Sequence, residues 1–361
     1  MYGLVFFLLT VLAACKQQHD KKIALLWQDD RAIGIQIPED LIRDASENRV
    51  EHSVKVVIAG KTHVPAILGE FSPDGDMVLF KPMIPLSPGL SYTILQDGRF
   101  VGNVTVPINT SQWPALVAIY PEKDTVPENL LKIYLRFSKP MRTGQSLEHV
   151  YLLDEHKDTM RNVFLALQPE LWDTTGTVLT LWLDPGRIKR GLVLNQKLGN
   201  PLKKSEHYTL IVSDRWKDTR GLQLVKTYTK QFYAGSRDEQ ILDINKWILT
   251  VPKAGTPEPL IIKTNAALDH YLLQESIEIL DGVGAPVKGN ISVSEKDQLW
   301  NFTPAEVWKA QNYKLHVNAR LEDLAGNNLN RVFDRDITKD KQTNKAYFDR
   351  MFVVKDQNIS P

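Results

Sequence analysis

The chain has 361 residues, of which 43% are hydrophobic, and its 44 Lys and Arg against 43 Asp and Glu leave a formal net charge of +1. The apolar fraction excludes a disordered chain, and the balanced charge argues against a nucleic-acid-binding protein, which normally carries a basic excess over a domain. A single cysteine excludes a disulfide framework within the chain.

The chain begins with an apolar segment that ends at this cysteine. The run from Leu4 to Ala14 contains no charged residue. It is shorter than the ~20 residues that span a bilayer, and its length is typical of the apolar region of a signal peptide. We therefore interpret 1–14 as a signal peptide, although 1–3 lack the usual Lys or Arg.

Residues 12–15, Leu-Ala-Ala-Cys, resemble a bacterial lipobox. In that family the peptidase cuts before the cysteine and the thiol carries a diacylglycerol, so the resemblance implies a lipid anchor on Cys15. The alternative is a free cysteine at a frayed N-terminus. Residues 15–22 are polar and predict a short tether. The non-acidic Lys16 is similar to the sorting signal of outer-membrane lipoproteins.

The next segment, 23–110, consists of short stretches in which apolar and polar residues alternate, such as 33–37 and 54–58. Alternation with a period of two predicts strands with one face in water. Pro73 and Gly75 lie between two such stretches and are typical of a turn. We expect a first β-sandwich over 23–110.

One signature occurs three times along the chain: an apolar run that ends in a proline, followed by a strand that opens with a tyrosine. The pairs are Pro82 and Tyr92, Pro185 and Tyr208, and Pro304 and Tyr313. The intervals each fit one sandwich of ~100 residues. The tyrosines favour a tyrosine corner, in which the hydroxyl bonds to the backbone at one end of the sandwich; simple core aromatics would require the same fold. We expect further sandwiches over 115–236 and 240–356.

The second of these segments contains a recognisable series of motifs. They are Tyr-Pro at 120–121, Asp-Thr-Val-Pro-Glu-Asn at 124–129, Phe-Ser-Lys-Pro-Met at 137–141 and Asp-Thr-Arg-Gly at 218–221. This order resembles the SbsA-type bacterial Ig-like domain, which implies a seven-stranded Greek-key sandwich. In the third segment, 265–269 replaces Phe-Ser-x-Pro-Met, and 323–327 matches the closing loop. The predicted fold is therefore all-β, with tandem Ig-like sandwiches, and such sandwiches serve as spacers, adhesion modules and enzyme accessories alike.

The second segment also carries the feature that is not repeated, an insertion between Pro185 and Tyr208. Its six cations, without any acidic residue from Gly186 to Ser205, are Arg187, Lys189, Arg190, Lys197, Lys203 and Lys204. Arginines in a glycine-flanked turn suit bidentate binding of phosphate or carboxylate. We expect a candidate site for an anionic envelope polymer or an acidic partner protein. The alternative is an insertion that packs on the sandwich through its apolar residues, with its charges solvated or paired.

Catalytic motifs of the zinc-protease, serine-hydrolase, P-loop and dinucleotide-binding kinds are missing from the sequence. We expect no enzyme, no cofactor and no metal. Asp323 and Asn327 are interpreted as turn residues rather than calcium ligands. His149 and His156 are expected at the surface.

A row of exposed tryptophans would suit stacking on sugars. We expect burial of Trp182 and Trp300, and surface positions near the insertion for Trp172 and Trp216.

Three functions follow from these patterns. The leading hypothesis is a non-enzymatic, lipid-anchored protein of the cell envelope, at the outer membrane, whose Ig-like domains bind a partner protein or an anionic polymer through the insertion. The second is an enzyme or accessory protein that acts on envelope glycans along a groove between domains. The third is a purely structural spacer, which neutralisation of the insertion by nearby acids would favour.

Overall fold

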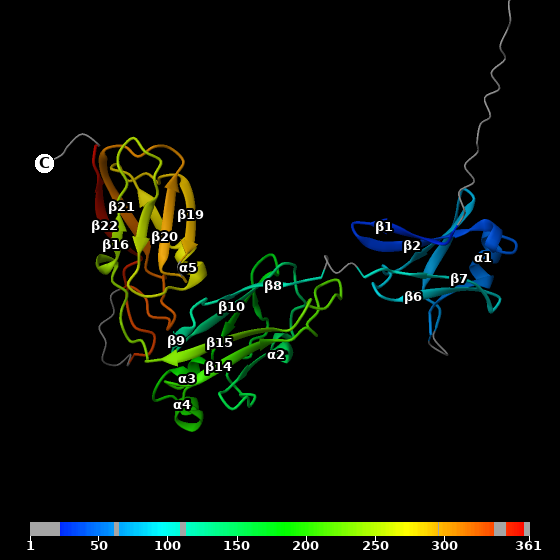
Figure 1. Cartoon of the computed structure of the whole chain (residues 1–361), viewed down its shortest axis with the longest axis horizontal. Coiled ribbons are helices and arrows are strands. Elements are labelled where there is room, and N and C mark those ends of the chain that lie inside the picture. The colour runs from blue at the N-terminus through cyan, green and yellow to red at the C-terminus, as the bar shows by residue number, and fades with distance from the viewer. Residues whose placement is uncertain (1–21, 61–64, 109–112, 295, 336–343, 357–361) are drawn as a thin grey trace, which may run out of the picture. The chain divides into compact units, whose positions relative to one another are not determined.

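The computed structural model describes residues 22–60, 65–108, 113–294, 296–335 and 344–356, and the chain divides into two compact units, 1–111 and 112–361 (Figure 1). The expected signal peptide 1–14, Cys15 and most of the tether 15–22 lie outside the described residues. No helix within the described ranges is both long and apolar enough to cross a membrane.

The first unit contains one sandwich of two antiparallel sheets, with strand orders β1-β2-β5-β4 and β3-β6-β7. The strands are β1 (Ala24–Gln28), β2 (Arg31–Pro38), β3 (Val54–Ile58), β4 (Gly69–Asp74), β5 (Met77–Pro82), β6 (Ser91–Gln96) and β7 (Arg99–Thr105), with η1 (Glu39–Leu41) and α1 (Glu47–Ser53) between β2 and β3. Alternate residues of β6 are buried, as the period of two requires.

The second unit begins with a sandwich whose sheets have the orders β12-β13-β10-β8 and β11-β14-β15-β9. The strands are β8 (Leu116–Tyr120), β9 (Thr125–Pro127), β10 (Lys132–Phe137), β11 (Val150–Leu153), β12 (Leu171–Trp172), β13 (Val178–Trp182), β14 (His207–Val212) and β15 (Tyr228–Gly235), with α2 (Ser146–His149) before β11. Among the described strands of this sandwich, only β9 pairs in parallel, with the end of β15. The insertion forms two short helices, α3 (Pro185–Ile188) and α4 (Val193–Leu198).

The third sandwich belongs to the same unit and has the sheets β16-β17-β20-β19 and β18-β21-β22. Its elements are η3 (Ile244–Lys246), β16 (Ile248–Thr250), β17 (Leu260–Lys263), α5 (His270–Glu275), β18 (Ile277–Leu280), β19 (Gly289–Ser294), β20 (Leu299–Pro304), β21 (Gln311–Asn318) and β22 (Tyr347–Val354). The chain is therefore all-β, with Ig-like sandwiches, as the sequence predicts.

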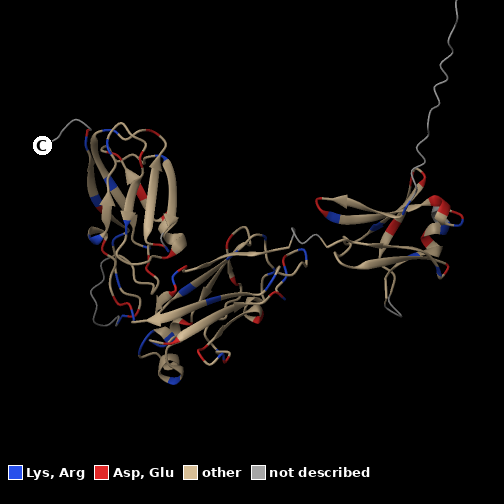
Figure 2. Ribbon diagram, viewed as in Figure 1, with Lys and Arg blue, Asp and Glu red and all other residues tan. Residues whose placement is uncertain are grey.

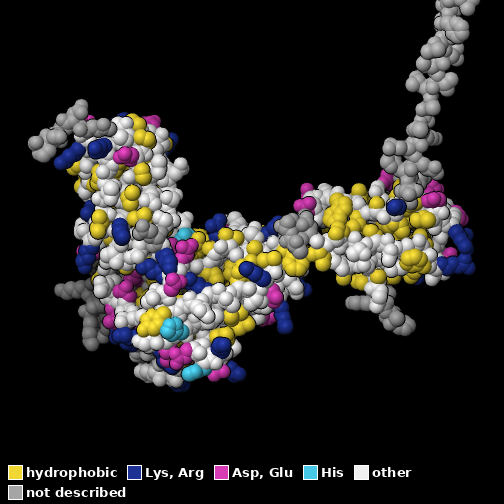
Figure 3. Space-filling model, in the orientation of Figure 1, with side chains coloured by type: hydrophobic (Ala, Val, Ile, Leu, Met, Phe, Trp, Pro, Cys, Tyr) yellow, Lys and Arg dark blue, Asp and Glu magenta, His cyan; other side chains and the backbone are white. Residues whose placement is uncertain are grey.

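Each sandwich has its own apolar core, and the three cores fall within 23–110, 115–236 and 240–356. Two residues of the third sandwich, Leu324 and Phe333, also pack against the core of the second. The second and third sandwiches thus share an interface. Apolar side chains also remain on the surface of both units (Figure 3).

The tyrosine corners predicted from the repeat are confirmed in all three sandwiches. The hydroxyl oxygens of Tyr92, Tyr208 and Tyr313 accept hydrogen bonds from the backbone N–H groups of Ser87 (2.8 Å), Lys203 (2.8 Å) and Lys309 (3.1 Å). Each tyrosine therefore fixes the loop that precedes its strand, in addition to filling the core.

The closing loops of the second and third sandwiches show the expected turn chemistry. Asp218 Oδ1 accepts from the N–H groups two and four residues later, at 2.9 and 2.8 Å, and Asp323 Oδ1 does the same at 2.8 and 2.9 Å. Gly221 and Gly326 have positive φ angles of 91° and 80°. Leu268 bridges to Asp323 as Met141 bridges to Asp218, so 265–269 does occupy the place of Phe-Ser-x-Pro-Met.

Two expectations about aromatic residues need correction. Trp216 is wholly buried and its Nε1 donates to the carbonyl of Arg142 at 3.1 Å, so the surface position considered for it is wrong. Trp172 is half-buried against the same core. His149 stacks on Trp216 with ring centroids 5.7 Å apart and is also half-buried, whereas His156 is exposed as expected. Trp216 therefore fills the hydrophobic core, and Trp172 and His149 pack partly against it instead of facing water.

Trp300 is fully buried, as expected, because it alternates with solvent-facing residues along β20. Trp182 is half-buried and lies under the ammonium group of Lys132, with 5.3 Å from Nζ to the ring centroid.

Candidate functional site

Arg187, one of the six cations of the insertion, points into it. Its guanidinium group donates to five backbone carbonyls, those of Arg161 (3.3 Å), Asn162 (2.9 Å), Leu198 (3.3 Å), Gly199 (3.1 Å) and Asn200 (3.0 Å). The side chain is 6% exposed, and burial lowers the pKa of its guanidinium group. Because a buried cation needs polar partners and these carbonyls supply them, Arg187 holds the insertion together and its donors are directed inward.

Lys189 and Arg190 face the third sandwich. Arg190 Nε lies 3.0 Å from Asp334 Oδ2, and its Nη2 pairs with Glu239. Lys189 Nζ lies 4.3 Å from the centre of the Phe333 ring. Figure 2 shows these basic and acidic segments side by side where the insertion meets the third sandwich. The acids that pair with the insertion are distant in sequence, so the sequence did not reveal them.

Lys197, Lys203 and Lys204 are exposed. Lys203 Nζ lies 3.4 Å from Glu206, and the backbone N–H of Lys204 donates to Glu128 Oε2 at 3.1 Å. Over the described part of the chain, the side chains of Lys197 and Lys204 form no ion pair. Anion binding by the insertion stays a prediction, and these three lysines are the residues in position for it.

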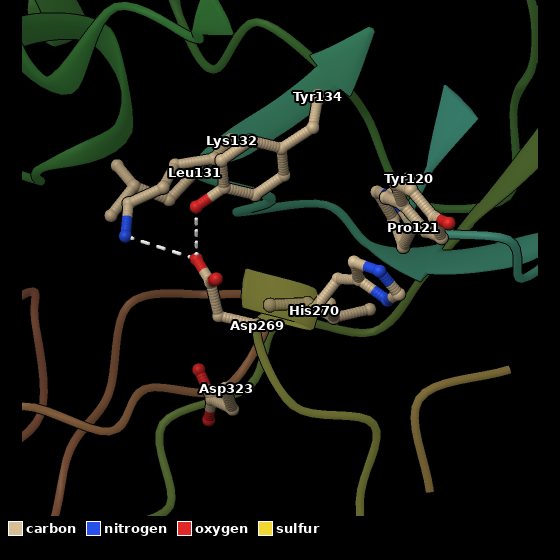
Figure 4. Close-up of a pocket in the computed structure, with 9 residues that line it drawn as sticks. Tyr120, Pro121, Leu131, Lys132, Tyr134, Asp269, His270 and Asp323 are labelled. Carbon is tan, nitrogen blue, oxygen red and sulfur yellow. Dashed lines mark hydrogen bonds and ion pairs between the residues drawn. The ribbon is translucent and has the colours of Figure 1, made fainter. Parts of the chain in front are cut away.

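A second cluster lies between the second and third sandwiches (Figure 4). Lys132 Nζ, on β10, lies 3.1 Å from Asp269 Oδ2 and 2.7 Å from Glu322 Oε2. Tyr134, two residues further along the same strand, donates from its hydroxyl to Asp269 Oδ2 at 2.6 Å. Asp269 also caps α5, because its Oδ1 accepts from the N–H of Leu272 at 3.1 Å. The carboxylate of Asp269 therefore both caps α5 and binds two residues of the neighbouring sandwich.

Aromatic contacts extend this cluster. The His270 ring stacks on Tyr120 with centroids 3.5 Å apart, and Tyr134 meets Tyr271 edge-on at 4.9 Å. His270 Nδ1 lies 2.6 Å from Asp297 Oδ1, while its Nε2 lies 2.8 Å from the side-chain amide of Gln274. These two contacts fit the tautomer that carries its proton at Nδ1.

The junction has its own electrostatics. Burial alone would lower the pKa of Lys132, but Asp269 and Glu322 outweigh burial and raise it. Burial raises the pKa of Glu322 despite Lys132, and burial followed by the charge of Asp269 raises the pKa of the Tyr134 hydroxyl. Burial raises the pKa of Asp323 to about 7, although hydrogen bonds from Asn327 act in the opposite direction.

The space inside this cluster is small. The cavity among its residues has a volume of about 10 Å³, which is room for one water molecule at most. Its lining residues are Tyr120, Pro121, Leu131, Lys132, Tyr134, Asp269, His270, Asp323 and Leu324. Within the described ranges, no three His, Asp or Glu side chains converge as metal ligands. The arrangement suits a packed domain junction.

Sequence reasoning did not find this junction. Lys132 and Asp269 are far apart in the chain, and neither belongs to a motif. The position of Asp269 directly before a short helical segment was the one local signal, since aspartate is a preferred helix cap.

Comparisons with known proteins add little to this geometry. No family model and no curated protein sequence matches the chain. The N-terminal part of the bacterial S-layer protein SbsC is 10% identical over 68% of this chain and 45% of that one, with a TM-score of 0.24. A three-domain Ig fragment of the titin I-band is 6% identical over 84% and 87%, with a TM-score of 0.21.

The chain spans less than half of the SbsC structure. Similarity at these TM-scores carries no argument about function, and the SbsA-type resemblance stays a prediction. The Ig-like fold assignment rests on the strand orders and registers described above.

Proposed function

We propose that this chain is a lipid-anchored, non-enzymatic protein of the bacterial cell envelope, in which the second and third sandwiches act as one stiff spacer arm. The observation that carries the proposal is the ion-pair cluster that joins the two sandwiches, in which Asp269 is buried and Lys132 and Glu322 are half-buried. Interfaces between domains of one chain are often polar and permit motion. A paired cluster that is largely shielded from water opposes such motion, because separation would leave its charges without partners.

The linker between the two sandwiches is held from both sides. Asn129 of the second sandwich donates to the carbonyl of Asp238 at 2.8 Å and accepts from its N–H at 2.9 Å. Asn327 of the third sandwich donates to the same carbonyl at 3.1 Å. Hinge motion requires a few residues that change their backbone angles. These hydrogen bonds restrain the backbone of Asp238, which lies in the linker where such a change would occur.

The insertion acts as a brace in this proposal. Arg190, together with Arg237 at 2.6 Å, pairs with Asp334, whose side chain is 9% exposed. Lys189 covers Phe333. Three of the predicted anion-binding cations therefore either hold the insertion together or contact the third sandwich, which supports the spacer hypothesis.

The lipid anchor on Cys15 is proposed from the sequence alone. The apolar run before Cys15 and the resemblance of 12–15 to a lipobox support attachment to the membrane, with the outer membrane as the expected location. The SbsA-type motifs support a bacterial envelope protein.

The test is a distance measurement between spin labels on the two sandwiches. Because Cys15 is the only cysteine, a mature chain with Cys15→Ser accepts labels at Thr174→Cys and Val283→Cys, two exposed sites in the second and third sandwiches. We expect one narrow distance distribution. Combined Lys132→Ala and Asp334→Ala should broaden it, whereas Arg320→Ala, which removes an exposed ion pair with Glu275, should not. A broad distribution in the unmodified junction would rule out a stiff arm.

Anion binding is retained as a second function because Lys197, Lys203 and Lys204 are exposed together on the same loop. We expect the mature chain to bind isolated envelope fractions in a salt-sensitive manner, and to lose this binding on combined substitution of the three lysines by Ala. Arg215→Ala serves as the control for loss of an exposed cation elsewhere on the sandwich. Binding that survives the triple substitution would assign the interaction to another surface.

The hypothesis of an enzyme or accessory protein that acts on glycans finds no support in the geometry of the junction. Asp269 and Glu322 are both bound to Lys132, and the cavity beside them is far smaller than a sugar ring.

A further inference from the structure

One edge of the second sandwich is only partly covered. The last strand, β15, pairs with β14 from Tyr228 to Tyr233, but β9 covers its other edge only at Tyr233, Ala234 and Gly235. The strand β8, from the opposite sheet, pairs with β10 alone. Two strand edges therefore border the same side of the sandwich.

The hydrogen-bonding groups of β15 show which way its free edge points. The N–H of Tyr233 donates to Asp124 O at 2.7 Å, towards β9, whereas the N–H of Ala234 donates to Glu206 O at 3.0 Å, towards β14. Because neighbouring residues of a strand alternate, Thr229 and Gln231 direct their N–H and C=O groups to the same edge as Tyr233. Both residues are exposed, and neither N–H bonds to another described backbone group.

A hollow of about 310 Å³ lies beside this edge. Its lining includes Leu116, Val117, Ala118 and Ile119 of β8, Glu122, and Tyr228, Thr229 and Lys230 of β15. Val117 is 55% exposed. An apolar side chain can therefore lie against β8 while its backbone pairs with β15.

Lys230 gives this edge its charge. It alternates with Thr229 and Gln231 and lies on the side of β15 that carries Phe232 into the core. Its Nζ donates to Glu122 O at 3.2 Å, and over the described residues it forms no ion pair. Burial lowers the pKa of the Lys230 ammonium group. Asp124 and Glu122 act on Lys230 only at longer range. A half-buried cation without a carboxylate in contact favours an acidic residue on whatever covers it.

We propose that the free edge of β15 is a strand-addition site, which takes an extended peptide segment of another protein with an acidic side chain set against Lys230. Thr229 and Gln231 supply the main-chain hydrogen bonds, and the hollow beside β8 receives an apolar side chain next to the acid. A second copy of this chain fits less well. Antiparallel pairing of β15 with itself about Lys230 would place two ammonium groups together, a known protection against edge-to-edge association.

The test uses random decapeptides displayed on phage and selected on the mature chain with Cys15→Ser. We expect enrichment of peptides that alternate apolar and polar residues around an Asp or Glu. The Gln231→Pro variant removes one edge N–H and blocks the added strand, and proline is tolerated at a strand edge. Gln231→Ala is the matched control, because it changes the side chain and keeps the N–H. Thermal unfolding of both variants checks that the sandwich is intact.

A synthetic copy of the most enriched peptide is then titrated against each variant. We expect affinity to fall about tenfold or more in Gln231→Pro, to stay within about twofold in Gln231→Ala, and to fall with loss of salt dependence in Lys230→Gln. No enrichment on the mature chain, or equal affinity for Gln231→Pro, would overturn the proposal. Self-association of Lys230→Gln without a change in peptide affinity would show that the lysine only protects the edge.

Discussion

The closing loops of the second and third sandwiches share a sequence pattern and a set of hydrogen bonds, but they serve different purposes. Asp218 pairs with Arg220 at 3.1 Å within its own loop. Asp323 has no ion pair among the described residues, and the loop that it holds packs on the second sandwich: Leu324 O accepts from the N–H of Leu131 at 2.9 Å. The same turn thus closes one sandwich and also joins the third sandwich to the second. Both carboxyl groups are buried, but only that of Asp218 has a cation beside it.

Removal of the cation at the junction should have the largest effect. Lys132→Ala leaves Asp269 and Glu322 facing each other without their shared cation, and loss of one member of a buried pair costs about 3–5 kcal/mol. We expect the free energy of unfolding of the second unit, measured by urea denaturation, to fall by this amount. Arg320→Ala, from an exposed pair, should cost less than about 1 kcal/mol. Equal costs would mean that the junction adds no stability.

The next effect concerns pH. The pKa of Asp323 is about 7 in the folded chain and about 4 when unfolded. Between these values the folded state retains a proton that the unfolded state has lost, so stability is fully present below about pH 4 and falls as the pH rises to about 7. The loss is on the order of 2–4 kcal/mol.

Asp323→Asn should remove most of this slope from urea denaturation measured across the same pH range. Glu322, whose pKa is also raised, leaves a smaller slope of the same sign. Asp218→Asn is the matched control and should retain the full slope. An unchanged slope in Asp323→Asn would assign the pH dependence to other groups.

Alanine substitution of the two loop glycines should have a smaller effect on stability, and the difference between them separates the cost of backbone strain from the cost of lost contact at the interface. Gly221→Ala and Gly326→Ala both place a side chain at a positive φ angle, which costs about 1–2 kcal/mol. The added Cβ at Gly326 would also collide with Leu131 of the second sandwich, whereas at Gly221 the nearest atom is Arg142 Nη2 at 3.3 Å. We expect Gly326→Ala to destabilise more in thermal unfolding. Equal losses would place Leu131 out of contact with the loop.

The tyrosine corners should give the smallest effects. Tyr→Phe at 92, 208 or 313 removes one hydrogen bond from a backbone N–H and costs about 1 kcal/mol. The change at Tyr208 should cost most, because its hydroxyl also donates to Glu206 at 2.8 Å. Urea denaturation of the three variants gives the ranking, and a ranking led by Tyr92 or Tyr313 would contradict this reading.

The sandwiches could be predicted because their determinants are local. Strand alternation, the tyrosine that opens β6, β14 and β21, and the Asp-x-x-Gly loops each act within a few residues. The segment 265–269, which lacks the Phe-Ser-x-Pro-Met residues, lies where the order of the surrounding motifs predicts, with Leu268 in the place of Met141.

The junction could not be predicted, because its contacts depend on how two folded domains meet. Lys132 lies in a strand with alternating polar and apolar residues. This alternation accounts for a lysine at that position, so the sequence gives no sign of its partner Asp269. The direction of Arg187 depends on carbonyls of 161–162 that lie outside the insertion. The predicted surface position of Trp216 is wrong because this residue lies in a loop. A loop residue that packs into the core has no hydrophobic periodicity around it that would reveal its burial.

The inward arginine of the insertion also limits how this segment can be exchanged. Two of its five carbonyl partners come from 161–162, so residues 186–205 and that separate loop form one transplantable module. A graft of 186–205 alone between Pro82 and Tyr92 of the first sandwich would bury Arg187 without two of the carbonyl groups that accept its hydrogen bonds. Recombination of such domains must therefore move both segments together or replace Arg187 with an apolar residue.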